Sequence, residues 1–432
     1  MNIHQEQHLI YSPPVNQATK RWGVYAIPRM WREKNGELIV RFNGEADTAF
    51  VDNMQAAPNL YFVSYDNGTT FKKVEDGLEK YPIDILTGIG SGYFKLKDGT
   101  TLCYRAKNCD AIKGITPTKT VMHPNGEALL NCYRYGDIPH NCKGFERIAY
   151  NKDMNIISVD DVIFDFDTRE VHVNYKAKND DDGNYYEVEQ FIKPYIFKNP
   201  YFTEVTELYD GTLVAICAGQ HPDVTDRYCP EVYLIESKDK GITWTKRGTV
   251  ASDKNMKYGY SGDGNEMTLA YLKNGDLLCA MRMDVSIHPD VEKPVCDTML
   301  ARSKDNGYTW EKPFSVSDSS VTPHVISLEN GVVAVVYGRP GVHFVYSTDY
   351  GYTWSEPVSI IGKTLTEERL DGKSDFESKY ADTISYSNTF VEKCDDNSFV
   401  VIYNNVKYDD GDGLHHKAAF IKKISFEIDT KI

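Results

Sequence analysis

The sequence lacks any surplus of positive charge. Its 432 residues include 48 Lys and Arg against 63 Asp and Glu, which gives a formal net charge of −15 at pH 7. No cluster of Lys or Arg stands out along the chain, and neutralising the phosphates of a nucleic acid requires such a cluster. We therefore expect no nucleic-acid partner, and an anionic small substrate would need a few arginines gathered locally.

Long apolar runs and a recognisable leader are missing as well. No stretch approaches the roughly 18 apolar residues that span a membrane, so no membrane partner is expected. The first residues, MNIHQEQHLIYSPP, contain neither the basic segment nor the continuous apolar segment of a secretory signal. We expect a cytoplasmic protein, or a secreted one if a leader has been trimmed.

The nine cysteines show no pairing pattern. None forms a Cys-x-x-Cys pair, and an odd number fits reduced, buried thiols better than a disulfide framework. His221, His288 and His324 each lie beside a proline in predicted loops, and His415–His416 is expected in an exposed loop. Because these residues lack the spacing of a metal motif, we expect no metal ion and no cofactor.

Helical periodicity is nearly absent, and a turn followed by a short β-rich run recurs instead. Asn-Gly is the strongest short hairpin signal, because a type I′ turn needs positive φ at both central residues. Seven hairpins predict an all-β, antiparallel chain, and repeated four-stranded units that cannot bury their own faces predict a propeller. Each β-rich run follows an Asn-Gly or Asp-Gly pair or, in the last case, a degenerate copy of it. These turns begin at Asn35, Asp98, Asn125, Asp210, Asn274, Asn330 and Asp396.

A second repeat is sharper and reads Ser-x-Asp-x-Gly-x-Thr followed by Trp or Phe. Its four copies begin at Ser64, Ser237, Ser303 and Ser347. Asp can hydrogen-bond the backbone of its own turn, Gly can adopt positive φ, and the aromatic residue opens the next strand and packs inward. We therefore predict that these aspartates hold turns and take no part in catalysis.

The positions of the repeats predict one propeller domain spanning residues 1–432. The long gap after the first copy leaves room for blades with a decayed turn motif and for an insertion at about 151–190. The acidic run Val159–Asp167 in that insertion is interpreted as a solvated loop. Counting one hairpin per blade, with those at Asp98 and Asn125 merged, gives six antiparallel four-stranded blades, and seven is the alternative.

These motifs resemble those of one known family. The Ser-x-Asp-x-Gly-x-Thr-Trp repeat is similar to the Asp-box (BNR repeat) of sialidases (neuraminidases) and their relatives, which are six-bladed propellers. The segment 264–282 resembles the sialidase segment in which a Glu opens a blade and an Arg closes the following strand. Tyr386-Ser387 resembles the Tyr-Ser element of the last blade, and Ile27-Pro28 resembles a first-blade motif. Asp-boxes specify the superfamily better than the reaction, since non-hydrolytic propellers carry them too.

The resemblance implies a tyrosine mechanism. Tyr386 matches the nucleophile, and Glu266 matches the neighbouring carboxylate that makes the phenol more nucleophilic. An Asp on a mobile loop serves the family as acid/base, and Asp47 matches it, with Glu45 as the rival. A carboxylate nucleophile would be repelled by the carboxylate of the substrate, and a tyrosine nucleophile avoids this repulsion.

The resemblance also implies three arginines around the substrate carboxylate, because a guanidinium pairs bidentately with a carboxylate and stays charged. Arg282 matches one of them, and Arg339 is a candidate for another. The family has an arginine immediately before Ile-Pro, where this chain has Ala26. Arg29 lies just after that motif and would point to the opposite face of a strand. Arg41, at the end of an apolar run, is an additional candidate.

The sequence thus predicts a retaining, exo-acting glycoside hydrolase of sialidase type that removes a terminal acidic sugar, sialic acid or a related one, from a glycan. A polysaccharide lyase, another glycosidase on the same propeller and a non-catalytic glycan-binding propeller remain alternatives. Tyr386, Glu266 and Arg282 should meet at one mouth of the central channel, with the Asp-box turns on the rim away from it. The oligomeric state is left open.

Overall fold

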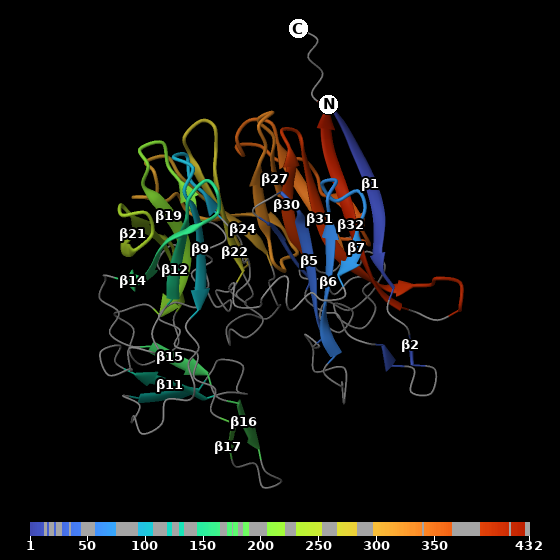
Figure 1. The fold of residues 1–432 in the computed structure, drawn as a ribbon, viewed down its shortest axis with the longest axis horizontal. Coiled ribbons are helices and arrows are strands. Elements are labelled where there is room, and N and C mark those ends of the chain that lie inside the picture. Colours follow the sequence, from blue (N-terminus) through green and yellow to red (C-terminus); the bar gives the residue numbers. More distant parts are fainter. Residues whose placement is uncertain are drawn as a thin grey trace.

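Six sheets are arranged as the blades of a propeller in the computed structural model (Figure 1). Each blade has four antiparallel strands, and one of the six sheets carries a fifth, parallel strand at its edge. Every regular element among the described residues is a β-strand, and the described part of the chain has no helix able to span a membrane. The all-β, six-bladed prediction is confirmed. The structure describes residues 1–12, 15–16, 21–22, 28–33, 36–44, 57–74, 94–106, 119–122, 129–133, 145–164, 171–174, 176–179, 185–189, 205–220, 230–252, 266–282, 297–338, 341–364, 389–413 and 416–427.

The first three blades follow one another along the chain. Blade 1 contains β4 (Pro28–Arg32), β5 (Leu38–Gly44), β6 (Ala57–Ser64) and β7 (Lys72–Val74). Blade 2 contains β8 (Phe94–Lys95), β9 (Thr101–Ala106), β12 (Phe145–Tyr150) and β13 (Ile156–Asp161). Blade 3 contains β18 (Thr206–Glu207), β19 (Leu213–Gln220), β20 (Pro230–Ser237) and β21 (Thr243–Ala251).

The remaining blades complete the ring, and the last of them pairs the first strand of the chain with the last described strand. Blade 4 contains β22 (Met267–Tyr271), β23 (Leu277–Arg282), β24 (Thr298–Ser303) and β25 (Phe314–Ser317). Blade 5 contains β26 (His324–Ser327), β27 (Val333–Gly338), β28 (Val342–Ser347) and β29 (Val358–Ile361). Blade 6 contains β30 (Phe390–Asp395), β31 (Ser398–Tyr408) and β32 (His416–Glu427), and β1 (Asn2–Tyr11) pairs antiparallel with β32 as its fourth strand.

Successive strands of a blade alternate in direction, so the ring has two distinct ends. The turns from first to second strand and from third to fourth strand lie at one end, here named the turn end. First strands begin and second strands finish at the other end, here named the mouth end. First strands contact one another around the axis, as β22 does with β26, β26 with β30, and β30 with β4.

The predicted hairpins are confirmed, but their turn type is not. Six of the seven join a first strand to a second strand, and the one at Asn125 lies between two strands outside the blades. In blade 4 the N–H of Gly275 donates to the carbonyl of Leu272 (2.9 Å), and Gly275 has a φ of 90°. This is a type I turn followed by a left-handed glycine. Type I′ was wrong because Asn274 stays at negative φ and its Oδ1 accepts the N–H of Asp276 instead.

The Asp-box turns join third strands to fourth strands, and their aspartates hold the turns as predicted. In blade 5 the Ser347 hydroxyl donates to Asp349 Oδ1 (2.6 Å), which also accepts the N–H of Thr353 (2.9 Å). Asp349 Oδ2 accepts the Thr353 hydroxyl (2.6 Å). Burial alone would raise the pKa of Asp349, but the hydrogen bonds from Ser347 and Thr353 outweigh it and lower the pKa to about 2.

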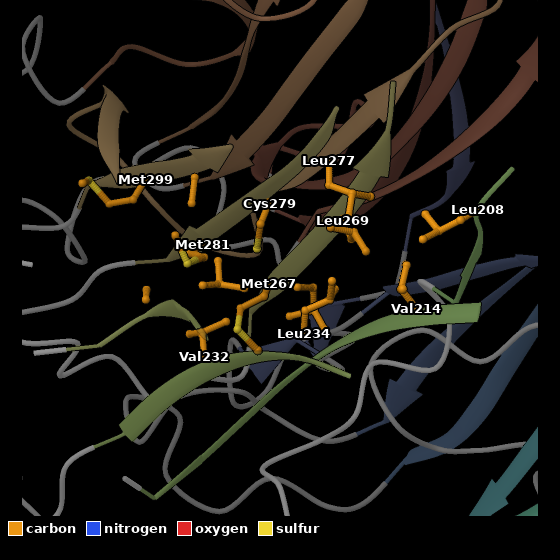
Figure 2. Packing of buried hydrophobic residues seen from close by; sticks show 14 residues of the cluster. Leu208, Val214, Val232, Leu234, Met267, Leu269, Leu277, Cys279, Met281 and Met299 are labelled. Carbon is orange, nitrogen blue, oxygen red and sulfur yellow. The ribbon is translucent and has the colours of Figure 1, made fainter. Parts of the chain in front are cut away.

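The aromatic residue of each Asp-box packs against the preceding blade. Trp244 of blade 3 is fully buried with its ring centroid 6.5 Å from that of Tyr104 in blade 2, and Trp310 packs on the cluster between blades 3 and 4. That cluster joins side chains of β19 and β20 to side chains of β22 and β23 (Figure 2). Gly307 has a φ of 94°, and a β-carbon there would overlap Leu234 of blade 3. The hydrophobic core therefore lies between blades, where the repeats fit together.

Several strands lie outside the six blades. Strands β10 (Lys119–Met122), β11 (Leu129–Tyr133) and β15 (Val171–Asn174) form one small sheet, and β16 (Lys176–Asn179) pairs with β17 (Tyr185–Glu189). Both lie below the blades in Figure 1, at the mouth end. Two short strands near the N-terminus, β2 (Val15–Asn16) and β3 (Arg21–Trp22), form a further pair, and β14 (Ile163–Phe164) runs parallel to β21.

This arrangement corrects the predicted insertion at 151–190. The turn and strand over 151–161 belong to blade 2, whereas β10 and β11 belong to the inserted sheet. The acidic run from Val159 begins in β13 and is not a loop there. The outer strand of a blade exposes much of its length, so its sequence resembled that of a solvated segment.

The cysteines behave as expected where their side chains are described. Cys103, Cys217 and Cys279 are free and buried, and Cys394 is free and partly buried. Burial raises the pKa of the Cys394 thiol to about 11. Burial also raises the pKa of the Cys217 thiol, so the thiols of Cys217 and Cys394 are protonated near neutral pH.

Candidate functional site

Glu266 and Arg282 lie side by side at the mouth end of blade 4. Glu266 directly precedes β22 and Arg282 ends β23, so the antiparallel pairing sets them together. Arg282 Nη1 lies 3.0 Å from both carboxylate oxygens of Glu266, and the Arg282 N–H donates to the Glu266 carbonyl (3.1 Å). The two residues meet as expected, whereas their catalytic roles stay predictions.

Glu266 also contacts the next blade through Thr322, which precedes β26. The Thr322 N–H donates to Glu266 Oε2 (2.7 Å). Thr322 is buried and has a φ of 43°, a conformation that a β-branched residue adopts rarely and at an energetic cost. Such strain concentrates at functional sites, where the surroundings hold it in place. Here the surroundings include the carboxylate of Glu266.

Thr389 extends this network to blade 6. Its N–H donates to Thr322 Oγ1 (2.7 Å) and its hydroxyl donates to the Thr322 carbonyl (3.0 Å). Thr389 is fully buried and directly precedes β30. Glu266, Thr322 and Thr389 thus connect the first strands of blades 4, 5 and 6. Sequence reasoning missed both threonines, although each stands just ahead of a first strand, as Glu266 does.

His324 lies beside this network as the first residue of β26, where a loop was expected. Its ring centroid is 5.2 Å from that of Phe390. Burial lowers the pKa of His324 to about 4, against a smaller opposing effect of the Thr389 backbone. The imidazole is therefore neutral near pH 7. It can donate one hydrogen bond and accept another without carrying a charge.

Blade 1 presents two arginines at the same end of the ring. Arg29 in β4 is directly opposite Arg41 in β5, and Arg41 is opposite Tyr61 in β6. Directly paired residues share a face with about 5 Å between their β-carbons, so Arg29 does not point away from Arg41. Both are buried, at 8% and 5% exposure, and Arg41 Nε has no hydrogen-bond partner among the described residues. Two guanidinium groups on one face of a sheet can bind the same carboxylate, because each presents paired N–H donors.

Three predicted site residues lie outside the described residues. Tyr386 is three residues before Thr389, Asp47 is three residues after the end of β5, and Arg339 directly follows β27. Glu45 and Ala26 also lie outside them. In the sequence, Asp47 and Arg339 come after second strands and Tyr386 comes before a first strand.

Comparison with known proteins gives a family match over part of the chain. Residues 188–391 match the family described as BNR repeat-like domain, a range that contains blades 3, 4 and 5. No curated protein sequence matches the chain.

Solved structures are similar at low sequence identity. A protein of unknown function from Dyadobacter fermentans is 17% identical with a TM-score of 0.53, covering 98% of this chain and 99% of that one. The NanB sialidase of Streptococcus pneumoniae is 14% identical with a TM-score of 0.43, covering 98% and 70%. The α-L-arabinofuranosidase of Fusarium graminearum is 13% identical with a TM-score of 0.45, covering 96% of both chains.

At such identities the similarity concerns the fold, and the Dyadobacter protein shares it along nearly its whole length. The repeat match contains three of the four Asp-boxes, those that begin at Ser237, Ser303 and Ser347. The chain is therefore a six-bladed β-propeller with four Asp-boxes, and its residues 188–391 are similar to the BNR repeat-like domain.

Proposed function

We propose that this protein is a retaining, exo-acting glycoside hydrolase that releases a terminal acidic sugar, sialic acid or a related one. The observation that carries the proposal is the buried Arg29–Arg41 pair at the same end of the ring as the Glu266–Arg282 pair. Guanidinium groups bind carboxylates through paired, charge-assisted hydrogen bonds. An acidic sugar supplies the anion that two adjacent arginines favour, against a chain whose net charge is −15.

The proposed nucleophile is Tyr386, with Glu266 as its base. A phenol has a pKa near 10 and needs an adjacent proton acceptor. Tyr386 is three residues from Thr389, a separation that a chain spans in about 11 Å at most. Thr389 is connected to Glu266 through Thr322. We therefore expect the phenol to reach the carboxylate.

In the proposed reaction the Tyr386 oxygen attacks the anomeric carbon while its proton passes to Glu266. Asp47 protonates the leaving glycosidic oxygen, and a covalent glycosyl-tyrosine forms. Asp47 then takes a proton from water, which attacks the same carbon as the bond to the Tyr386 oxygen breaks. Glu266 returns its proton to the Tyr386 oxygen, and the sugar leaves with its configuration retained. Arg282 orients Glu266, and Arg29, Arg41 and Arg339 bind the substrate carboxylate.

The test is hydrolysis of aryl glycosides by the purified chain. Release of the aryl alcohol from an aryl sialoside or an aryl uronide is expected, and nuclear magnetic resonance should show the retained anomer first. Tyr386→Phe should abolish release. Tyr65→Phe is the matched control, because Tyr65 is 61% exposed at the turn end, and it should leave the rate unchanged.

Other outcomes would contradict the proposal and identify its alternatives. An unsaturated product that absorbs in the near ultraviolet would indicate a lyase. A rise in melting temperature with an intact acidic sugar would indicate a glycan-binding propeller. Release from neutral aryl glycosides alone would show that the arginines do not recognise the substrate.

A further inference from the structure

A cluster of potential metal ligands lies in the loop between β31 and β32 of blade 6, outside the site described above. His416 Nε2 is 2.9 Å from Asp412 Oδ1 and 3.2 Å from Asp410 Oδ1. The three potential ligand atoms all lie within 4.8 Å of one another. The loop joins a second strand to a third strand and therefore lies at the mouth end.

His416 is the feature that distinguishes this cluster from a group of exposed acids. It is the first residue of β32, is paired with Tyr408 and is only 3% exposed, so the expectation of an exposed loop was wrong for this histidine. Its Nε2 carries at most one hydrogen, yet it faces two carboxylate oxygens at hydrogen-bond distance. One divalent cation among the three groups would bind both carboxylates and the ring nitrogen together.

The observed spacing fits a small transition-metal ion. Nitrogen and oxygen ligands lie about 2.1 Å from Zn²⁺, so adjacent ligands are roughly 3.0 to 3.4 Å apart at angles between 90° and tetrahedral. The two measured separations are close to this range. One imidazole with two carboxylates suits Zn²⁺ better than Ca²⁺, which takes oxygen ligands at 2.3–2.6 Å.

Neighbouring groups hold the loop and one of the carboxylates. The Ser12 hydroxyl, which follows β1, donates to Asp410 Oδ2 (3.1 Å). Asp409 Oδ1 accepts the N–H of Gly411 (2.8 Å) and of Gly413 (3.1 Å). Groups that orient metal ligands in this way strengthen binding. Through Ser12 the cluster is also connected to the N-terminal strand of the same blade.

We propose that Asp410, Asp412 and His416 bind a divalent transition-metal cation, Zn²⁺ by preference, which fastens the blade that closes the ring. The site is structural, stands apart from Glu266 and Arg282, and does not depend on the hydrolase activity.

The test is calorimetric titration of the chelator-treated full chain with ZnCl₂ and, separately, with CaCl₂. We expect one equivalent of Zn²⁺, no binding of Ca²⁺, and a melting temperature that rises with saturating Zn²⁺. Asp412→Asn and His416→Gln should each weaken Zn²⁺ binding at least tenfold and remove the rise. The Asp412 side chain is 39% exposed, so Asp412→Asn keeps the test valid if His416→Gln fails to fold.

His4→Gln is the matched control, since His4 is 59% exposed beside Glu427 and should leave binding unchanged. Replacing Zn²⁺ with Co²⁺ distinguishes binding at this site from binding at the cysteines. Thiolate ligands of Co²⁺ give an intense charge-transfer absorption, and the proposed ligands contain no thiolate. Equal Zn²⁺ affinity in the parent chain and Asp412→Asn would overturn the proposal. So would a thiolate absorption band, or Ca²⁺ binding that does not need His416.

Discussion

The two ends of the ring use charged residues in opposite ways. At the turn end, the bonds of Asp349 stay within its own turn, to Ser347, Tyr352 and Thr353. At the mouth end, Glu266 contacts Arg282, 16 residues away, and Thr322, 56 residues away. Local bonds make a turn that can be repeated around the ring. Long-range bonds make a site that occurs once.

This difference separates the residues that mark the fold from those that carry chemistry. The Asp-box recurs in four blades. The carboxylate oxygens of its aspartate already accept hydrogen bonds inside the turn, so they are not available to bind a substrate. The mouth end gathers carboxylate and guanidinium groups from different blades, together with a strained threonine. Substitutions at the turn end should therefore change stability, and substitutions at the mouth end should change activity.

The largest expected effect is at the turn end. Trp244→Ala should lower the free energy of unfolding by about 4 kcal/mol, because it removes a fully buried indole between blades 2 and 3. Urea denaturation measures it. Tyr65→Ala, which removes an exposed aromatic residue of another Asp-box, should cost less than about 0.5 kcal/mol. Equal costs for the two variants would show that the Asp-box aromatic residue does not join the blades.

At the mouth end, Glu266→Gln should lower kcat for an acidic aryl glycoside about 100-fold, equivalent to about 2.7 kcal/mol. Gln keeps the shape and can accept the Thr322 N–H, but it cannot take the phenol proton. Glu311→Gln is the control, since Glu311 pairs with Lys304 on an exposed surface at the turn end (2.7 Å). Full activity of Glu266→Gln would show that Glu266 is not the catalytic base, and it would contradict the assignment of catalysis to the mouth end.

Asp349→Ala should destabilise the chain by about 2 kcal/mol, because several charge-assisted hydrogen bonds are lost together. The specific activity of the folded fraction should not change. The measurement is denaturant unfolding followed by a rate assay in the absence of denaturant. A loss of activity without a loss of stability would give this aspartate a role beyond its turn.

The same aspartate should make stability depend on acid. Its folded pKa of about 2 is below the ordinary value of 3.8, so its contribution is fully present above pH 3.8. That contribution is lost as the pH falls from 3.8 through about 2. The difference in unfolding free energy between the parent chain and Asp349→Ala should therefore shrink over this range. A constant difference would contradict the assignment.

The smallest expected effect on stability is at the mouth end. Arg41→Met should leave the unfolding free energy unchanged or raise it by up to about 1 kcal/mol, because like charges directly opposite in a sheet repel each other. KM for an acidic aryl glycoside should rise about tenfold, and any activity on a neutral glycoside should stay constant. A stability loss above about 2 kcal/mol would show that Arg41 serves the fold.

Local signals made the fold predictable from the sequence. Hairpin glycines and Asp-box residues act over a few positions, so their pattern survives in one sequence without knowledge of tertiary contacts. The outer strand β13 escaped prediction because it exposes much of its length. The turn type was missed because Asn274 and its equivalents fold their side chains onto the backbone in place of adopting positive φ.

The site was predictable only where a motif resembled a known one. Glu266 and Arg282 were found that way, and the structure brings them into contact. Thr322 and Thr389 carry no charge, and they contact each other although they are 67 residues apart in the sequence. No pattern among their sequence neighbours identifies them. His416 escaped for a similar reason: its burial depends on strand pairing with β31, which the sequence His-His does not reveal.

The pairing of β1 with β32 has a consequence for how the ring is made. Asn2 lies opposite Glu427 and Tyr11 lies opposite Ala419, so β1 must wait for a strand that is synthesised hundreds of residues later. Until then β1 has no partner in its sheet, and blade 6 cannot reach four strands. Contacts so distant along the chain form slowly. Closure of blade 6 therefore depends on the pairing of two strands that are hundreds of residues apart in the chain.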